Sequence, residues 1–174
     1  MESRVKLFGH PVHPMLIVLP LGLLSTAVVF DIVHLLTGEP AFSTVAFWNI
    51  AAGIVGGLLA AVFGAWDWMH IPSETRAKRI GLLHGGGNVV VVVLFALSWL
   101  LRAGAVDYEP SALAYVFSFA GLALAAVTGW LGGELVDRLG VGVDPGANLD
   151  APNSLSGAPA AGDLRAAGRP SGRP

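Results

Sequence analysis

The chain has 174 residues, enough for one domain, but 54% of them are hydrophobic and only 13% are charged. Soluble domains carry roughly 25% charged residues, so this composition excludes a mostly water-exposed surface, and the net charge of −2 offers no basic surface for nucleic acid. The absence of cysteine excludes disulfides, thiolate metal ligands and covalent haem attachment. Any metal site must therefore use His, Asp, Glu, Asn or backbone oxygens.

Four apolar runs follow one another along the chain, and each is long enough to cross a bilayer as a helix, which takes about 20 residues. The first run exceeds the roughly 7–15 apolar residues of a signal peptide, so we expect a retained membrane helix there. Pro20 lies inside this run and predicts a kink. An isolated strand cannot satisfy its backbone in lipid, which favours helices throughout. The predicted spans are residues 14–36, 45–69, 80–101 and 112–131.

The last part of the chain differs in composition from the rest. Residues 144–174 are rich in proline and glycine and contain no aromatic residue. Such a segment cannot form a hydrophobic core and is typical of disorder. The sequence therefore predicts an all-α integral membrane four-helix bundle in residues 1–143, followed by a disordered tail in residues 144–174.

The distribution of Lys and Arg predicts the orientation in the membrane. The first connection between spans has no basic residue, and the third has only Arg102. The basic residues that flank the opposite side are Arg4, Lys6, Arg76, Lys78, Arg79 and Arg138. By the positive-inside rule, both termini and the second connection are cytoplasmic. We therefore expect a multi-pass protein of the cell membrane, with the lipid bilayer as its main partner.

Polar side chains gather at the ends of the spans that this topology places in the cytoplasm. They are His10, His13, Asp67, His70, His84, Asn88, Glu134 and Asp137. Ionisable residues in spans are costly and usually face the protein interior. We expect six of them to form one polar site: His84, His10, His13, Asp67, Asn88 and Glu134. His84 is the first candidate for a ligand, with Asp67 as its orienting partner.

Each member of this cluster also has a simpler interpretation. His70 lies at a span boundary, where an imidazole needs no special partner. For His84 and Asn88, which share a helix face, structural hydrogen bonding and ligand contact both stay open. His10 and His13 each precede a proline, which favours extended geometry. In that geometry residues three apart lie about 9 Å apart on one face, so we expect these two rings to bind different groups.

The opposite ends of the spans also carry polar residues, but these do not form an evident cluster in the sequence. Their polar residues are Asp31, His34, Glu39, Asp107 and Glu109, and we interpret them as ordinary polar residues of loops. Ser98 and Ser118 are isolated within spans, so we expect their hydroxyls to bond to their own helix backbone.

Several ordered motifs in this chain resemble the DUF2231 family of small predicted membrane proteins. They are Gly9–Pro14 (GHPVHP), Leu19–Gly22 (LPLG), Gly64–Asp67 (GAWD), His84 with Asn88, and Gly129–Val136 (GWLGGELV). The resemblance covers about residues 8–143 and implies a four-span domain. Some relatives are fused to Rieske-type domains, which implies redox work. The family's closing motif has a His where this chain has Leu139, so no ligand role carries over to that position.

Three kinds of function fit these features. The first is a haem- or metal-binding membrane protein with a redox role and a redox protein as its partner, because four-helix bundles hold cofactors between inward side chains. The second is a structural or accessory subunit without a cofactor, in which the polar residues lock the bundle. The third, a small transporter, is less favoured because the spans show no internal repeat. The sequence contains no recognisable catalytic motif, which weighs against an enzyme but leaves the question open.

Overall fold

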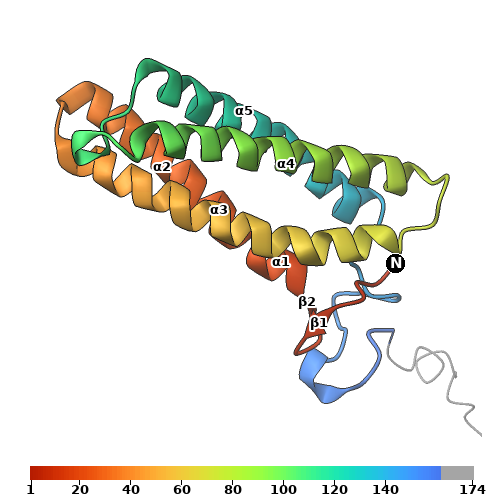
Figure 1. Ribbon diagram of the computed structural model, residues 1–174. Helices are drawn as coiled ribbons and strands as arrows, with labels where there is room; N and C mark the ends of the chain where they lie inside the picture. Colours follow the sequence, from red (N-terminus) through yellow and green to blue (C-terminus); the bar gives the residue numbers. More distant parts are fainter. Residues whose placement is uncertain (162–174) are drawn as a thin grey trace, which may run out of the picture.

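The computed structural model describes residues 1–161. Four long helices lie side by side as an up-and-down bundle, with short segments at one end (Figure 1). The elements are β1 (Lys6–Leu7), β2 (His10–Pro11), α1 (Val12–Leu16), α2 (Val18–Thr37), α3 (Pro40–Met69), α4 (Arg76–Arg102), the 3-10 turn η1 (Val106–Tyr108), α5 (Ala112–Gly133), the π-helical turn η2 (Glu134–Arg138) and the 3-10 turn η3 (Ser154–Ser156). The predicted all-α bundle is confirmed.

All four predicted membrane spans are present. Four helical segments of 26 to 30 residues are long and apolar enough to cross a membrane: Val12–Thr37, Pro40–Met69, Arg76–Arg102 and Ala112–Arg138. Each contains one of the spans predicted from the sequence. Large apolar side chains such as Leu58, Val89 and Val127 are exposed on the outer faces of the helices, as expected for surfaces that contact lipid rather than water.

The bundle has two distinct ends, which we name here. The termini end carries the N-terminal segment, the connection between α3 and α4, and the residues that follow α5 (Figure 1). The far end carries the connection between α2 and α3 and the longer connection between α4 and α5, which contains η1. Because the number of spans is even, the first span begins and the fourth span ends at the same end of the bundle.

The first span is broken near its start. Pro20 has no backbone N–H to donate to the carbonyl four residues earlier, that of Leu16. Helix α1 ends at this residue, and Ile17 separates α1 from α2. This break is the interruption that Pro20 predicts, displaced one turn toward the N-terminus. The prediction of extended geometry at His13 is wrong, because His13 lies within α1. Local preference before proline is overridden here by packing of α1 against α3.

The core lies between the helices near the middle and far end of the bundle. It is formed by Leu24, Ala27, Val28, Ala46, Ile50, Val91 and Phe95. Two glycines allow helices to come close. A Cβ on Gly53 would lie 2.5 Å from the Leu24 side chain, and one on Gly121 would lie 2.8 Å from the Phe95 ring. No side chain larger than hydrogen fits at either contact without displacement.

Residues 139–161 run along the termini end as turns and the single 3-10 turn η3. Most of residues 144–161 are exposed. A two-stranded hairpin formed by β1 and β2 lies beside it, with Leu7 paired to His10. The remaining residues of the predicted tail, 162–174, lie outside the described residues.

Candidate functional site

Two histidine rings from different spans lie close together toward the termini end. The ring centres of His13 in α1 and His84 in α4 are 6.4 Å apart, and the ring planes are perpendicular. His13 Nδ1 lies 2.9 Å from the carbonyl oxygen of Ala60, and His84 Nδ1 lies 2.8 Å from that of Thr128. A carbonyl oxygen only accepts, so each Nδ1 carries the proton. Each neutral ring is therefore left with its lone pair on Nε2.

Asn88 and Thr128 orient the His84 side of this pair. The Thr128 hydroxyl donates to Asn88 Oδ1 at 2.9 Å, and the Asn88 amide donates to the His84 backbone carbonyl at 2.9 Å. The same amide nitrogen lies 3.4 Å from His84 Nε2, a long contact. The sequence prediction that His84 and Asn88 share a face is confirmed, and Thr128 is a third member that sequence reasoning missed.

A glycine lies against each ring. A Cβ on Gly64 would be 2.8 Å from His13 Cε1, and a Cβ on Gly132 would be 3.0 Å from His84 Cε1. An alanine at either position would push on the imidazole. The backbone carbonyl bonds each ring at Nδ1, and the missing Cβ leaves room for the ring against the neighbouring helix.

Asp67 lies at the same end of the bundle but has other partners. Its two carboxylate oxygens accept from the Ser3 hydroxyl at 2.6 Å and from the Arg4 backbone N–H at 2.8 Å. Ser3 is buried. Asp67 therefore ties the N-terminal segment to the end of α3, and the group bonded to His84 Nδ1 is the Thr128 carbonyl rather than Asp67.

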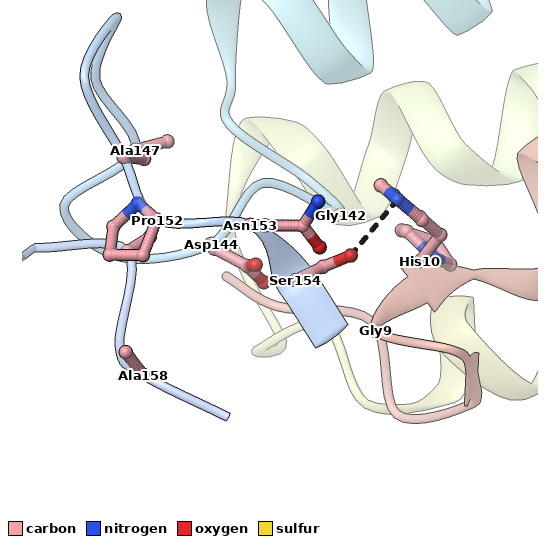
Figure 2. A pocket seen from close by; sticks show the side chains of 12 residues that line it. Gly9, His10, Gly142, Asp144, Ala147, Pro152, Asn153, Ser154 and Ala158 are labelled. Atoms are coloured by element: carbon pink, nitrogen blue, oxygen red, sulfur yellow. Dashed lines mark hydrogen bonds between the residues drawn. The ribbon is translucent and has the colours of Figure 1, made fainter. Parts of the chain in front are cut away.

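Glu134 and His10 are also engaged elsewhere. Glu134 begins the π-helical turn after α5 and pairs with Arg76 at 2.6 Å, which joins the end of α5 to the start of α4. His10 Nε2 lies 3.3 Å from the Ser154 hydroxyl, at the edge of an open, surface hollow of about 470 Å³. Figure 2 shows this hollow between the β1–β2 hairpin and the described part of the tail.

The six predicted site residues thus share one end of the bundle but not one site. His13, His84 and Asn88 come together. Asp67, Glu134 and His10 each hold a different surface segment. His70 is exposed and bonds to the Trp66 carbonyl of its own helix, as the simpler interpretation of an interfacial histidine predicts.

A second polar group lies at the far end, where the sequence predicted only ordinary loop polarity, and that prediction is wrong. Asp31 and Arg102 are fully buried and form a two-point ion pair, with distances of 2.6 and 2.7 Å. The Arg102 guanidinium also donates to the hydroxyls of Ser98 and Ser118. Ser98 in turn lies 2.8 Å from the Ala114 carbonyl of α5, so it does not bond to its own helix as expected.

The signal for this pair was present in the sequence. Asp31 lies well inside an apolar run, and an isolated charge there needs a partner. Ser98 and Arg102 are four residues apart, on one face of α4. Arg102 was interpreted as a loop residue because it closes the apolar run, and helix boundaries are the least certain part of such an assignment.

The described residues, 1–161, contain no group of three or more His, Asp or Glu side chains placed to hold a metal ion. The His13–His84 pair offers two nitrogen donors, which is fewer than the four of a usual zinc site. Two imidazoles match the number of protein ligands that a six-coordinate haem iron would take, because the porphyrin supplies the other four donors.

The sequence matches one protein family. A family model described as "Predicted membrane protein (DUF2231)" matches residues 9–145. The match covers all four spans together with His10, His13, Asp67, His84, Asn88 and Glu134. No curated protein and no solved structure matches the chain. From the length of the family match and the four apolar helices, the chain belongs to the DUF2231 family of predicted membrane proteins.

Proposed function

We propose that the chain is a haem-binding membrane protein of redox type, in which His13 and His84 would hold the haem iron. The observation that carries the proposal is the shared hydrogen-bond pattern of the two rings. Each imidazole donates from Nδ1 to a backbone carbonyl, which leaves its lone pair on Nε2. This is the tautomer and support that metal-binding histidines use.

The spacing of the rings supports a single shared metal centre. An imidazole nitrogen binds a metal at about 2.0–2.1 Å, so two histidines that held one metal would have ring centres about 6 Å apart. The observed separation of the ring centres is 6.4 Å. The rings come from α1 and α4, which are different spans. Four-helix bundles place cofactors between side chains of facing helices.

Haem fits this pair better than a bare metal ion does. A zinc or copper ion would need two or more further ligands from the protein. Asn88 contacts the His84 ring through its amide nitrogen, which is not a metal ligand. When bound, haem supplies one-electron chemistry at a potential set by its axial ligands and their surroundings. A one-electron carrier protein that reaches the termini end is the corresponding partner.

The alternative function is a structural or accessory subunit in which the hydrogen-bonded side chains around His84 only join the helices. The closed chain of hydrogen bonds from Thr128 through Asn88 to the backbone of His84 favours this alternative, because it needs no cofactor. The two functions differ in one measurable property. A ligand pair loses a chromophore when either ring is removed, whereas a structural layer loses only stability.

The experiment compares absorbance spectra and haem content of three purified variants with those of wild type. The parent chain should show reduced-minus-oxidised bands of a six-coordinate haem. His13→Ala and His84→Ala should each lose most of the bound haem. His70→Ala is the matched control, because His70 lies at the same end but is exposed and bonded to its own helix. Haem-free wild-type protein from haem-supplemented cells would contradict the proposal and leave the structural alternative.

We also propose that the protein lies in the cell membrane with both termini in the cytoplasm. The basic residues at the termini end, including Arg76, Lys78 and Arg79, support this orientation. Arg102 does not count as a basic residue of the third connection, because it is buried in an ion pair. Reporter fusions after Pro174 and near Glu39 should report opposite sides. A C-terminal reporter that is active outside the cytoplasm would overturn the orientation.

A further inference from the structure

His34, near the far end of α2, has an acceptor against each of its ring nitrogens. Nδ1 lies 2.9 Å from the backbone carbonyl oxygen of Glu39, and Nε2 lies 2.9 Å from Oε2 of Glu109. A carbonyl oxygen accepts only, and so does an ionised carboxylate. Both contacts exist together only when a proton lies between Nε2 and Glu109. The histidine and the carboxylate therefore hold one more proton together than a neutral imidazole and a free carboxylate do.

The two partners differ in access to solvent. The His34 side chain is only 5% exposed, whereas that of Glu109 is 59% exposed. The carboxylate is thus the route by which a proton reaches the buried ring. Glu109 belongs to the connection between α4 and α5, just before helix α5. The contact consequently attaches this connection to α2, across the far end of the bundle.

The other charged groups near His34 do not bond to its ring, so Glu109 is the carboxylate that shares the proton on Nε2. Asp31 precedes it by three residues on the same face of α2, and Asp31 is held by Arg102 in the buried ion pair. The Arg102 guanidinium also lies 5.8 Å from the Tyr115 ring centre. Asp107 contributes its backbone carbonyl to the Ser43 hydroxyl at 2.8 Å. Among the described residues, only the Glu109 carboxylate forms an ion pair with the His34 ring.

We propose that His34 and Glu109 form a proton-binding site that holds the α4–α5 connection against α2. The proton bound at Nε2 completes the hydrogen bond to Glu109. When it leaves for water, a lone pair faces a carboxylate at contact distance, and the exposed Glu109 side chain turns outward. The site lies at the opposite end from His13 and His84, so it does not depend on the proposed haem.

A spin label can report this change because the chain has no native cysteine. Val106 is 84% exposed within η1, on the same connection as Glu109. In full-length Val106→Cys protein, the label should be restricted near pH 5 and more mobile near pH 8, the range in which histidine usually titrates. A hydrogen bond to a charged group is worth about 1.5–3 kcal/mol, so the mobile fraction should change by about tenfold or more.

Two further substitutions in the Val106→Cys background separate the proposal from a general effect of pH. Glu109→Gln should keep the label restricted at both pH values, because an amide N–H can donate to the neutral Nε2. His34→Gln, with no titrating ring, should also abolish the response. His70→Gln is the control and should preserve it, since His70 lies at the termini end. A pH-independent label in the parent, or an unchanged pH response in Glu109→Gln, would overturn the proposal. Glu109 is exposed, so that variant is expected to fold even if His34→Gln does not.

Discussion

Arg102 and Asp31 are 71 residues apart in the sequence, yet they form a two-point ion pair with both side chains fully buried. The pair joins α2 to α4, and the serine hydroxyls around Arg102 extend the contact to α5. Two charges in an apolar interior are costly unless each satisfies the other. The far end of the bundle is therefore held in register by one specific contact as well as by apolar packing.

Neutralising one partner of the Asp31–Arg102 pair should lower the free energy of unfolding more than neutralising both. Asp31→Asn leaves Arg102 charged and buried, and Arg102→Gln leaves Asp31 charged and buried. We expect each single change to lower the free energy of unfolding by about 3–5 kcal/mol. The double variant has two neutral amides that can still bond to each other, so it should recover more than half of that loss. Unfolding of the purified protein in mixed micelles measures these values.

A control for this cycle is Arg138→Gln, which removes a charge from an exposed residue at the other end. It should change the stability by less than about 1 kcal/mol. Losses that simply add in the double variant would show that Asp31 and Arg102 are not coupled, contrary to the structure.

Two glycines of α5 should respond in opposite ways to a single methyl group. A Cβ on Gly132 would lie 3.0 Å from the His84 ring, whereas nothing lies within 4 Å of a Cβ on Gly129. Gly129→Ala should be neutral or stabilising, because alanine favours a helix by about 0.8–1.0 kcal/mol over glycine. Gly132→Ala should destabilise the protein and, if haem is bound, alter its spectrum. Thermal unfolding and absorbance of the two variants give the comparison.

The comparison of the two glycine variants also tests the position of the His84 ring when no haem is bound. If Gly132→Ala behaves like Gly129→Ala, the His84 ring has room to move, and the constrained ring on which the proposed function depends is absent.

The sequence predicts the helices well because membrane thickness imposes a length on every apolar run. All four spans follow from that rule alone. The relation between His84 and Asn88 also follows, because residues four apart on a helix are neighbours whatever the tertiary structure. Local rules of this kind do not say which helices meet, so Thr128 and the buried pair of Asp31 with Arg102 were not predicted.

The partners of Asp67 and Glu134 were beyond sequence reasoning for a different reason. Both side chains lie at the termini end, as predicted, but several short segments compete for them there. Asp67 binds the N-terminal segment and Glu134 binds Arg76 of α4. Equal depth in the membrane places residues in one layer, and the paths of the connecting segments decide which of them touch.

Asp67 should therefore control the order of the N-terminal segment. Asp67→Ala removes the acceptors for the Ser3 hydroxyl and the Arg4 backbone N–H. Hydrogen bonds to charged groups contribute about 1.5–3 kcal/mol each, so amide exchange at Arg4 should accelerate by about tenfold or more. Hydrogen exchange measured by mass spectrometry on the N-terminal peptide provides the test. Asp137→Ala, at an exposed position, should leave this exchange unchanged.

A chain that ends after Val143 should still insert into the membrane and purify as a folded protein. All four spans lie before that point. The backbone contacts of Met1 with Gly140 and Gly142 are also retained. The residues removed are rich in proline and glycine, and those of them that the structure describes, 144–161, are mostly exposed, which gives them little part in a core. Loss of the truncated protein from the membrane would contradict this prediction and assign the tail a role in folding.

The same truncation should loosen the β1–β2 hairpin, which touches the tail through Lys6 with Asp144 and through His10 with Ser154. The hydrogen bond to Asp144 raises the pKa of Lys6 above 10.5. A raised lysine pKa means that the contact stabilises the fold at neutral pH and is lost only as the pH rises past that value. At pH 7 the truncated chain should therefore show faster amide exchange in residues 6–11 than the full chain. Lys6→Gln in the full chain should reproduce part of this increase, and equal exchange in all three proteins would show that the tail contacts contribute nothing to the hairpin.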